Sequence, residues 1–434
     1  MALGGGVFVT QNKKLPGSYI NFVSADKASS VVGDRGVAAI PMVMDWGKSN
    51  EVITVTADIL RNSSLEVFGH AYTDKEMMPL REVFKNASKV YIYRLNVGKQ
   101  ASNDFCTALY GGTRGNKLST IIATNVDDPA KFDVQTLLDN KVVDTQIAKT
   151  PADLKDNKYV TFKGDATLSA TASTPLAGGE DGEVTGEDWQ KALDVLEGYS
   201  FNTLGIASTD EAVKDLAIFY TKRLRDEVGV KFQTVLYKSA SDDKGIINVV
   251  NKLKNESDET GNLVYWVTGA QAGCAVNKSC TNKKYDGELD VDTIYTQTQL
   301  EEAIDNGKFI MHKVGDDVRV LTDINSKVTV TEEEGEDFKS NQTVRVLDQI
   351  GNDIASIFNT KYLGEIPNDN SGRISLWSDI VAHHKQLSDI RAIENFSSDN
   401  VSVDQGDTKK KVIIKDEVTP TNSMEQLYMT VVVQ

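Results

Sequence analysis

Apolar residues recur along the chain with two spacings, the alternation of a strand and the three-to-four-residue spacing of a helix. In the first quarter, residues 52–57 and 90–95 alternate and are rich in β-branched and aromatic residues, which favours strands. A helix is expected between them, around residues 74–85. This pattern predicts a small mixed α/β domain over residues 31–98.

The segment before this domain has a different pattern. Residues 1–30 contain few apolar positions and are punctuated by glycines and by Pro16-Gly17. A strand is expected at residues 18–23, but no hairpin partner lies nearby in the sequence. We therefore predict an extended arm over residues 1–30.

A run of short β-type segments follows, separated by Asp, Asn, Gly and Pro. One short helix is expected near residues 151–157. This spacing of short strands and turns predicts an inserted β-sandwich over residues 99–177. The expected strands are residues 118–123, 132–134, 141–145 and 159–162.

Residues 178–328 alternate between helix and strand patterns, which predicts a parallel sheet flanked by helices. Thr185 through Asp188 should cap one helix, and Ser208-x-x-Glu211 should open a second that Gly229 closes. The inward faces of these helices are expected to carry Trp189, Leu193 and Leu196, and then Val213, Leu216, Tyr220 and Leu224. The expected strands are residues 204–207, 232–237 and 263–267.

The last segment, residues 329–434, contains two strongly amphipathic helical patterns, at residues 342–358 and 374–393. Two alternating segments follow, residues 411–414 and 427–433, and the second ends one residue before the chain does. The inward stripes of the helices are expected to be Leu347, Ile350, Ile354 and Ile357, and then Trp377, Ile380, His384, Leu387 and Ile390.

Composition and charge exclude several classes of function. The 434 residues suggest roughly two to four domains. A net charge of −16 argues against binding to duplex nucleic acid or to anionic lipid, because both need a basic face. No apolar run approaches the roughly 20 residues that a membrane crossing needs, and we expect no secretion signal and a cytoplasmic site of synthesis. The cysteines, Cys106, Cys274 and Cys280, support neither a disulfide framework nor a zinc site.

Two segments imitate binding motifs and a third is strongly acidic, and a simpler interpretation is favoured for each. Residues 111–117 resemble a phosphate-binding loop, but their spacing is wrong and they lead into a strand pattern, so we interpret them as a turn. Residues 286–292 carry alternate carboxylates like the start of a calcium loop, but Val291 and Gln297 stand where Gly and Glu are needed. The acidic run at residues 332–337 is interpreted as a charged connector.

Hydrolytic chemistry has little support in the sequence. A serine or cysteine nucleophile needs a histidine as its base, and the four histidines, His70, His312, His383 and His384, lie in no recognisable signature. His383 and His384 are adjacent on a predicted helix and point about 100° apart, so we expect one to be packed and the other exposed. We expect no enzyme activity, no metal and no cofactor.

Several segments, read in order, resemble the tail sheath proteins of contractile phages, especially those of defective prophages and phage-tail-like particles. The similarity spans essentially the whole chain, and a glycine-rich segment, Gly178-Gly179-Glu180-Asp181-Gly182, resembles the hallmark that opens the sheath α/β domain. The other segments that carry the resemblance are residues 2–6 with 15–22, 35–41, 110–116 and 352–433.

The resemblance implies a multidomain α/β plus β fold. It comprises the arm, the small mixed domain, the β-sandwich insertion, a subtilisin-like α/β domain at 178–328 without catalytic residues, and an α+β C-terminal domain at 329–434 that ends in a strand arm. It also implies a structural subunit that polymerises into a helical tube around an inner tail tube and contracts to drive that tube through the target cell envelope. The implied partners are other copies of the chain, the inner tube protein, and baseplate and tail terminator proteins. The implied location is the virion tail or a phage-tail-like particle assembled in the bacterial cytoplasm, with no nucleic acid and no stable direct membrane binding.

The two expected end strands are the candidate functional segments. Unpaired edges invite another chain to add a strand, and the resemblance implies that neighbouring subunits share such strands. Arg373, His383 and Lys385, on the second helix, are candidates for contact with the tube. A cryptic hydrolase on the α/β domain and another self-assembling shell, such as a surface layer, remain as alternatives. The strand residues are Ser18, Tyr19, Ile20, Asn21, Phe22 and Val23 at one end, and Leu427, Tyr428, Met429, Thr430, Val431, Val432 and Val433 at the other.

Overall fold

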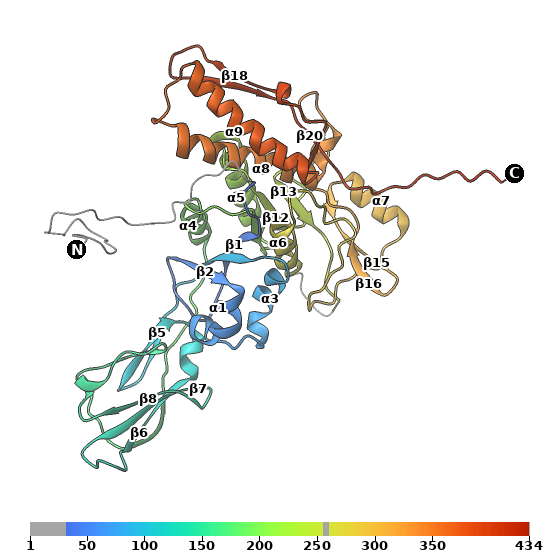
Figure 1. Cartoon of the computed structure of the whole chain (residues 1–434). Coiled ribbons are helices and arrows are strands. Elements are labelled where there is room, and N and C mark those ends of the chain that lie inside the picture. Colours follow the sequence, from blue (N-terminus) through green and yellow to red (C-terminus); the bar gives the residue numbers. More distant parts are fainter. Residues whose placement is uncertain (1–31, 255–259, 434) are drawn as a thin grey trace, which may run out of the picture. The chain divides into compact units, whose positions relative to one another are not determined.

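The computed structural model describes residues 32–254 and 260–433 (Figure 1). The chain divides into two compact units. The main unit contains residues 34–351 and 420–433, and the C-terminal unit contains residues 352–419 together with residues 32–33. The predicted strand at residues 18–23 lies outside the described residues.

A seven-stranded sheet forms the core of the main unit. Its order is β14-β13-β12-β11-β1-β3-β2, and all neighbours are parallel except β2, which runs antiparallel to β3. Every residue of β11, β12 and β13 is buried, as expected for parallel strands covered on both faces. The strands are β1 (Val37–Met42), β2 (Val52–Thr56), β3 (Lys89–Arg94), β11 (Thr203–Ile206), β12 (Gln233–Tyr237), β13 (Ile246–Val249) and β14 (Lys308–Phe309).

Helices cover both faces of this sheet. Ala38 and Ile40 of β1 pack with Leu80 and Val83 of α3, whereas Ala39 packs on the opposite face. That opposite face is covered by α4 and α5, through residues such as Leu193 and Ala217. Within the part of the chain that the structure describes, no helix has the length and apolar character that a membrane crossing requires. The helices of this region are α1 (Ala57–Asn62), α2 (Ser64–Phe68), α3 (Met78–Phe84), α4 (Gly186–Leu196), α5 (Glu211–Lys222), α6 (Leu263–Gly273) and α7 (Gln297–Asp305).

Two local predictions for this region are wrong. Residues 263–267 were expected to be a strand, but they begin α6, in which ten of the eleven residues are buried. A helix buried on all sides has no amphipathic period, so its apolar run cannot be distinguished from a buried strand by pattern alone. The second helix, α5, is capped by Asp210 and not by Ser208, since the Asp210 carboxylate accepts from the Ala212 N–H at 2.9 Å.

The predicted small domain at 31–98 shares its sheet with the α/β region that follows the sandwich. Strands β1 and β11 pair directly, so the two regions have one continuous sheet. The sequence could not show this pairing, because 160 residues separate Met42 from Thr203. The predicted fold class is confirmed: the chain has a multidomain mixed α/β architecture with a β-sandwich.

The β-sandwich consists of a four-stranded sheet, β10-β6-β7-β8, and a three-stranded sheet, β4-β5-β9. Leu118 and Leu138 from the first sheet pack with Ala108 and Val160 from the second. The short helix expected near 151–157 is a single 3-10 turn, Pro151–Asp153. The strands are β4 (Gln100–Ser102), β5 (Cys106–Gly111), β6 (Leu118–Thr124), β7 (Phe132–Leu138), β8 (Lys141–Ala148), β9 (Val160–Phe162) and β10 (Thr171–Pro175).

The C-terminal unit is built around helix α9 (Asn370–Asp389), which packs against the β18–β19 hairpin. The helix begins at its Asp369 cap and ends before Ile390, so it lies about one turn N-terminal to the predicted range. Ile390, which was expected to face inward, is 40% exposed. The other strands and the longer helical segments that follow α7 are β15 (Met311–Val314), β16 (Asp317–Val320), α8 (Asn341–Ile357), a π-helical turn (Phe358–Tyr362), β17 (Ile393–Glu394), β18 (Val401–Gln405), β19 (Val412–Asp416) and β20 (Thr419–Pro420).

Candidate assembly surfaces and polar sites

The C-terminal tail begins with a short anchored segment. The two oxygens of Glu425 accept from the hydroxyl groups of Thr281 and Thr322, both at 2.7 Å. Two residues before Glu425, the backbone N–H and the hydroxyl of Ser423 both donate to the side-chain oxygen of Gln342 at 3.0 Å. These contacts hold the base of the tail on the main unit.

Beyond this anchor the tail is exposed. Leu427, Tyr428 and Val433 are 86%, 88% and 90% exposed, and the tail extends away from its anchor in Figure 1. The predicted strand at 427–433 forms no ladder with the described part of the chain. Its backbone N–H and C=O groups are therefore available to another strand, and its apolar side chains favour such burial.

The three candidate tube-contact residues have different surroundings. Lys385 is exposed on α9, and Arg373 is partly exposed near the start of that helix. His383 is 0% exposed, so its side chain is not available to a partner, and this part of the prediction is wrong.

The expectation that one residue of the histidine pair is exposed is also wrong, because both rings are buried. His383 Nε2 lies 2.9 Å from Asp353, on α8, and His384 Nε2 lies 2.9 Å from Asp416, on β19. Helix α9 is covered from two sides, so side chains that point about 100° apart both reach a buried partner. The prediction of one exposed histidine assumed that only one face of this helix would be covered.

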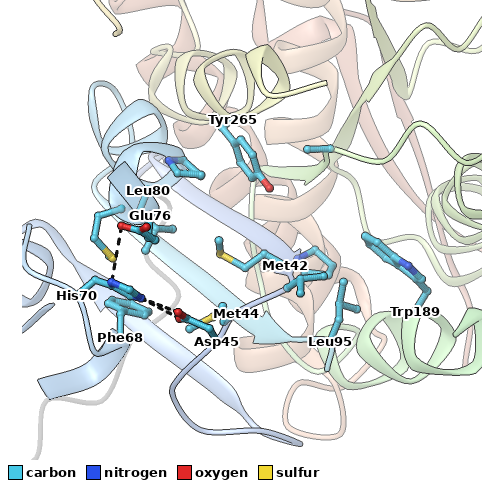
Figure 2. Close-up of a pocket in the computed structure, with 15 residues that line it drawn as sticks. Met42, Met44, Asp45, Phe68, His70, Glu76, Leu80, Leu95, Trp189 and Tyr265 are labelled. Atoms are coloured by element: carbon cyan, nitrogen blue, oxygen red, sulfur yellow. Dashed lines mark hydrogen bonds and ion pairs between the residues drawn. The ribbon is translucent and has the colours of Figure 1, made fainter. Parts of the chain in front are cut away.

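A cavity of about 360 Å³ lies beside the carboxyl ends of β1 and β11 (Figure 2). Strands β2 and β3, which follow β1 in the chain, lie on one flank of β1 in the sheet, and β11 lies on its other flank, so this is the position where open α/β sheets bind ligands. The walls are mainly apolar, with Met42, Leu80, Trp189 and Tyr265 among them.

One end of this cavity is polar. His70 Nε2 lies 2.9 and 3.0 Å from the two oxygens of Asp45, and its Nδ1 lies 3.7 Å from Glu76 (Figure 2). The residues that line the cavity in the described chain include no serine, threonine or cysteine that this histidine could activate. The sequence analysis missed this pair, although Asp45 comes three residues after the end of the buried strand β1.

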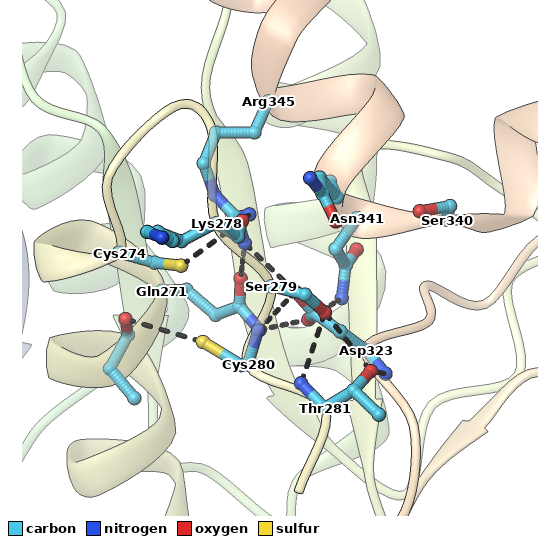
Figure 3. Close-up of polar contacts among 12 residues, drawn as sticks. Gln271, Cys274, Lys278, Ser279, Cys280, Thr281, Asp323, Ser340, Asn341 and Arg345 are labelled. Carbon is cyan, nitrogen blue, oxygen red and sulfur yellow. Dashed lines mark hydrogen bonds and ion pairs between the residues drawn. The ribbon is translucent and has the colours of Figure 1, made fainter. Parts of the chain in front are cut away.

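A buried polar cluster surrounds Asp323 (Figure 3). Its carboxylate accepts from Gln271 at 2.6 Å, from the Cys280 N–H and Asn341 at 2.9 Å, and from Arg345 at 3.1 Å. Burial favours the neutral acid, but the Arg345 charge and these hydrogen bonds outweigh burial and lower the pKa of Asp323. The cluster joins α6 to α8 and so has a structural role.

Two cysteines lie at the edge of this cluster. The hydrogen bond with Cys280, together with the Arg345 and Arg35 charges, lowers the pKa of Cys274 to about 7, while burial opposes the change. The same hydrogen bond and burial raise the pKa of Cys280. Among the described residues, no group of three or more His, Cys, Asp or Glu side chains is placed to hold a metal ion.

The segment that resembles a phosphate loop is a tight turn at Gly112 that leads into a short 3-10 helix, Thr113–Lys117. Gly112 has φ of +132°, and a Cβ at this residue would lie 1.9 Å from the Asp45 carbonyl oxygen. Asp181 accepts from the Thr113 N–H at 2.6 Å, which fixes the turn from the other side. The predicted interpretation as a turn is therefore supported. The Asp181 carboxylate already accepts from the Thr113 N–H, a donor that a bound phosphate would need.

Replacing Gly112 with Ala should lower the free energy of unfolding by about 2–4 kcal/mol, because the left-handed backbone and the close carbonyl both oppose a Cβ. Urea unfolding monitored by tryptophan fluorescence measures this change. Gly186→Ala is the matched control, since no atom lies within 4 Å of its added Cβ and Ala favours the first turn of α4. Equal stability of the two variants would contradict the turn interpretation.

Four family models match consecutive parts of the chain. They are the tail sheath protein Gp18 domain III N-terminal region at residues 35–95, the phage tail sheath protein beta-sandwich domain at 97–181, the phage tail sheath protein central domain at 182–326 and the phage tail sheath C-terminal domain at 333–434. Together they account for nearly all of the described chain.

Known proteins resemble the chain over nearly its full length. The phage-like element PBSX protein XkdK of Bacillus subtilis strain 168 is 32% identical and covers 99% of this chain and 99% of its own. The crystal structure of the sheath tail protein from Desulfitobacterium hafniense has a TM-score of 0.83 at 34% identity, covering 95% of this chain and 99% of that chain. The helical sheath of the anti-feeding prophage in its contracted state shares the fold, with a TM-score of 0.55 at 12% identity over 97% of this chain and 99% of that chain.

Proposed function

The chain belongs to the phage tail sheath family, as a structural subunit of a contractile tail sheath, and from this premise we propose that its two ends are β-strands shared between copies. The observation that carries the proposal is the exposed apolar tail at 427–433, held at its base by Glu425. An anchored base aims the tail away from its own subunit, and an apolar strand with unpaired backbone groups is completed by another chain.

We assign the complementary strand to residues 18–23 of the N-terminal arm, which lie outside the described residues. Each backbone hydrogen bond contributes only about 0.5–1.5 kcal/mol net. A strand at each end of every copy still produces a continuous network, because the contact is repeated throughout the polymer. Since the two ends differ, the contact is head-to-tail and builds a helical tube when it does not close on itself.

Proteins of this family assemble with themselves and with a baseplate. For this chain we propose an inner tube protein, a baseplate protein and a tail terminator as partners, in a virion tail or phage-tail-like particle assembled in the bacterial cytoplasm. Arg373 and Lys385 remain the proposed contacts with the tube. Contraction would release an extended, kinetically trapped state, with subunits moving as rigid bodies while the shared strands act as hinges.

The assembly proposal predicts that the purified full chain polymerises into tubes visible by negative-stain microscopy. Deleting residues 1–24 should leave a folded, monomeric chain that forms no tubes, as measured by circular dichroism and light scattering. Tubes of normal diameter from this truncated chain would contradict the strand-sharing proposal while leaving the family assignment intact.

We further propose that the chain is not an enzyme and that the subtilisin-like likeness of its α/β region concerns the fold alone. The Asp45–His70 pair supports this view, because its cavity supplies no nucleophile from the described lining residues. A peptidase and esterase screen should give the same background turnover for the wild-type chain and for His70→Ala. Turnover that disappears specifically in His70→Ala, with the fold preserved, would establish a hydrolase.

A further inference from the structure

A second cavity, of about 380 Å³, lies entirely within the C-terminal unit. Its floor is apolar and includes Leu376 and Val412, while Leu363 and Ile366 at its lip are 61% and 44% exposed. We name this cavity the basic groove, because three cations line it: Arg373, Lys409 and Lys410.

The turn that carries Lys409 and Lys410 is fixed through its backbone. The Asn368 side chain donates to the carbonyl oxygen atoms of Lys409, at 3.1 Å, and Lys411, at 2.8 Å, which fixes the β18–β19 turn beside the start of α9. Lys409 and Lys410 are exposed, and within the described residues no salt bridge occupies their amino groups. A groove with an apolar floor and free cations at its rim fits a segment that is both apolar and acidic.

The chain itself carries such a segment, at residues 328–334, which we name the acidic loop. Its base is fixed at both ends. The N–H groups of Val328 and Thr329 donate to Asp242, at 2.7 and 2.9 Å, and Glu334 binds Lys327 at 2.6 Å and also Lys244.

Between these two anchors the acidic loop presents its charges to solvent. Val330 is 43% exposed, and Glu332 and Glu333 are exposed without a salt bridge to any described cation. The acidic loop thus offers the apolar side chain of Val330 followed by two carboxylates, which is the chemistry that the basic groove would accept.

We infer that the acidic loop of one copy docks in the basic groove of the next copy in the polymer. This inference rests on the proposed self-assembly, and it assigns Arg373, named above as a proposed tube contact, to the contact between copies instead. A head-to-tail contact needs two different, complementary surfaces on each copy, and these two surfaces are complementary in charge and in apolar character. In a chain of net charge −16, a cationic groove also lets copies attract each other locally despite their overall repulsion.

The test is a charge swap in the full chain with both ends intact. Lys409→Glu with Lys410→Glu reverses the basic groove, and Glu332→Lys with Glu333→Lys reverses the acidic loop. Each double variant alone should raise the critical concentration for polymerisation at least about tenfold, as measured by sedimentation and negative-stain microscopy. These side chains are exposed, so circular dichroism should show an unchanged fold.

Two combinations should restore polymerisation. An equimolar mixture of the two variants can alternate along the polymer, so that every loop meets a groove of opposite charge. A single chain carrying all four substitutions should also polymerise. Raising the salt concentration should weaken the wild-type contact, because the screening length for exposed charges is about 10 Å at 0.1 M salt and shortens as more salt is added.

Matched controls carry the same change in net charge on the β-sandwich. Lys141→Glu with Lys158→Glu controls for the groove variant, and Asp127→Lys with Asp165→Lys controls for the loop variant. All four residues are exposed. Both control variants should polymerise like the wild-type chain.

Three outcomes would overturn the inference. In the first, the groove and loop variants polymerise normally, and a loss confined to binding of the inner tube would then assign the groove to that partner. In the second, polymerisation is restored in the chain with all four substitutions but not in the mixture of the two variants, which would place the contact within one chain. In the third, the controls are equally impaired, which would show a general charge effect. None of these outcomes bears on the shared terminal strands, which separate variants test.

Discussion

Single proline substitutions at alternate positions of the exposed tail are expected to impair polymerisation strongly while leaving the subunit folded. Proline lacks an N–H donor, and in a strand the donors of alternate residues point to opposite sides. Because the tail is 70% or more exposed at Met429 and Val431, a proline there should not disturb the subunit itself. If the tail adds to the edge of a neighbouring sheet, only one of two sets of prolines should impair polymerisation. Met429→Pro and Val431→Pro form one set. The other set is Tyr428→Pro, Thr430→Pro and Val432→Pro.

This dependence on alternate positions separates strand pairing from simple apolar contact. In an edge strand one set of prolines should raise the critical concentration for polymerisation strongly, and the other set should be tolerated. If the tail pairs on both sides, every proline in 428–432 should block assembly. Met429→Ala and Val431→Ala are the matched controls, since they keep the backbone donors and reduce only the apolar surface. Polymerisation unaffected by all five prolines would remove the tail from the assembly contact.

The end strands illustrate what a sequence can predict about such a protein. Alternation over residues 427–433 predicted a strand, and this strand was predicted to leave its backbone groups unpaired within its own subunit. The structure describes this tail as exposed, and its pairing with another copy remains a prediction. Local patterns also predicted α4, with its Thr185–Asp188 capping box, because such signals depend on only a few neighbouring residues.

The sequence failed where the outcome depended on residues far apart. Helix α6 carries no amphipathic period because it is buried on all sides, and its first residues therefore resembled a strand. The burial of both His383 and His384 depends on Asp353 and Asp416, which come from separate elements. Likewise, nothing in the spacing of residues 368, 373 and 409–410 indicates that they line one groove.

Replacing Asp323 with Asn is expected to produce the largest loss of stability among the changes considered. Arg345 and Asp323 have side chains that are each only 1% exposed, so the substitution would leave a buried guanidinium without its counter-charge. Breaking one side of such a pair lowers the free energy of unfolding by about 3–5 kcal/mol. Urea unfolding of the monomeric chain measures this loss. Asp317→Asn is the matched control, because its ion pairs with Lys284 and Arg319 are partly exposed and contribute at most about 1 kcal/mol each.

A double-mutant cycle tests whether the charge pair itself is responsible. The double variant Asp323→Asn with Arg345→Met should be less destabilised than the sum of its single variants, because it removes the uncompensated charge along with its partner. Exact additivity would show that the loss comes from the other hydrogen bonds of Asp323 and not from the charge.

The dependence of stability on pH gives an independent test of the same cluster. Since the pKa of Asp323 is lower in the folded chain than its ordinary value of about 3.9, its ionised form stabilises the fold above that value. This contribution is lost as the pH falls through the lower, folded-state pKa. The wild-type chain should therefore lose stability below about pH 4 more steeply than Asp323→Asn, which has no carboxylate to protonate. Parallel curves for the two proteins would mean that Asp323 does not hold its charge in the folded state, and the buried cluster would then be a neutral hydrogen-bond network joining α6 to α8.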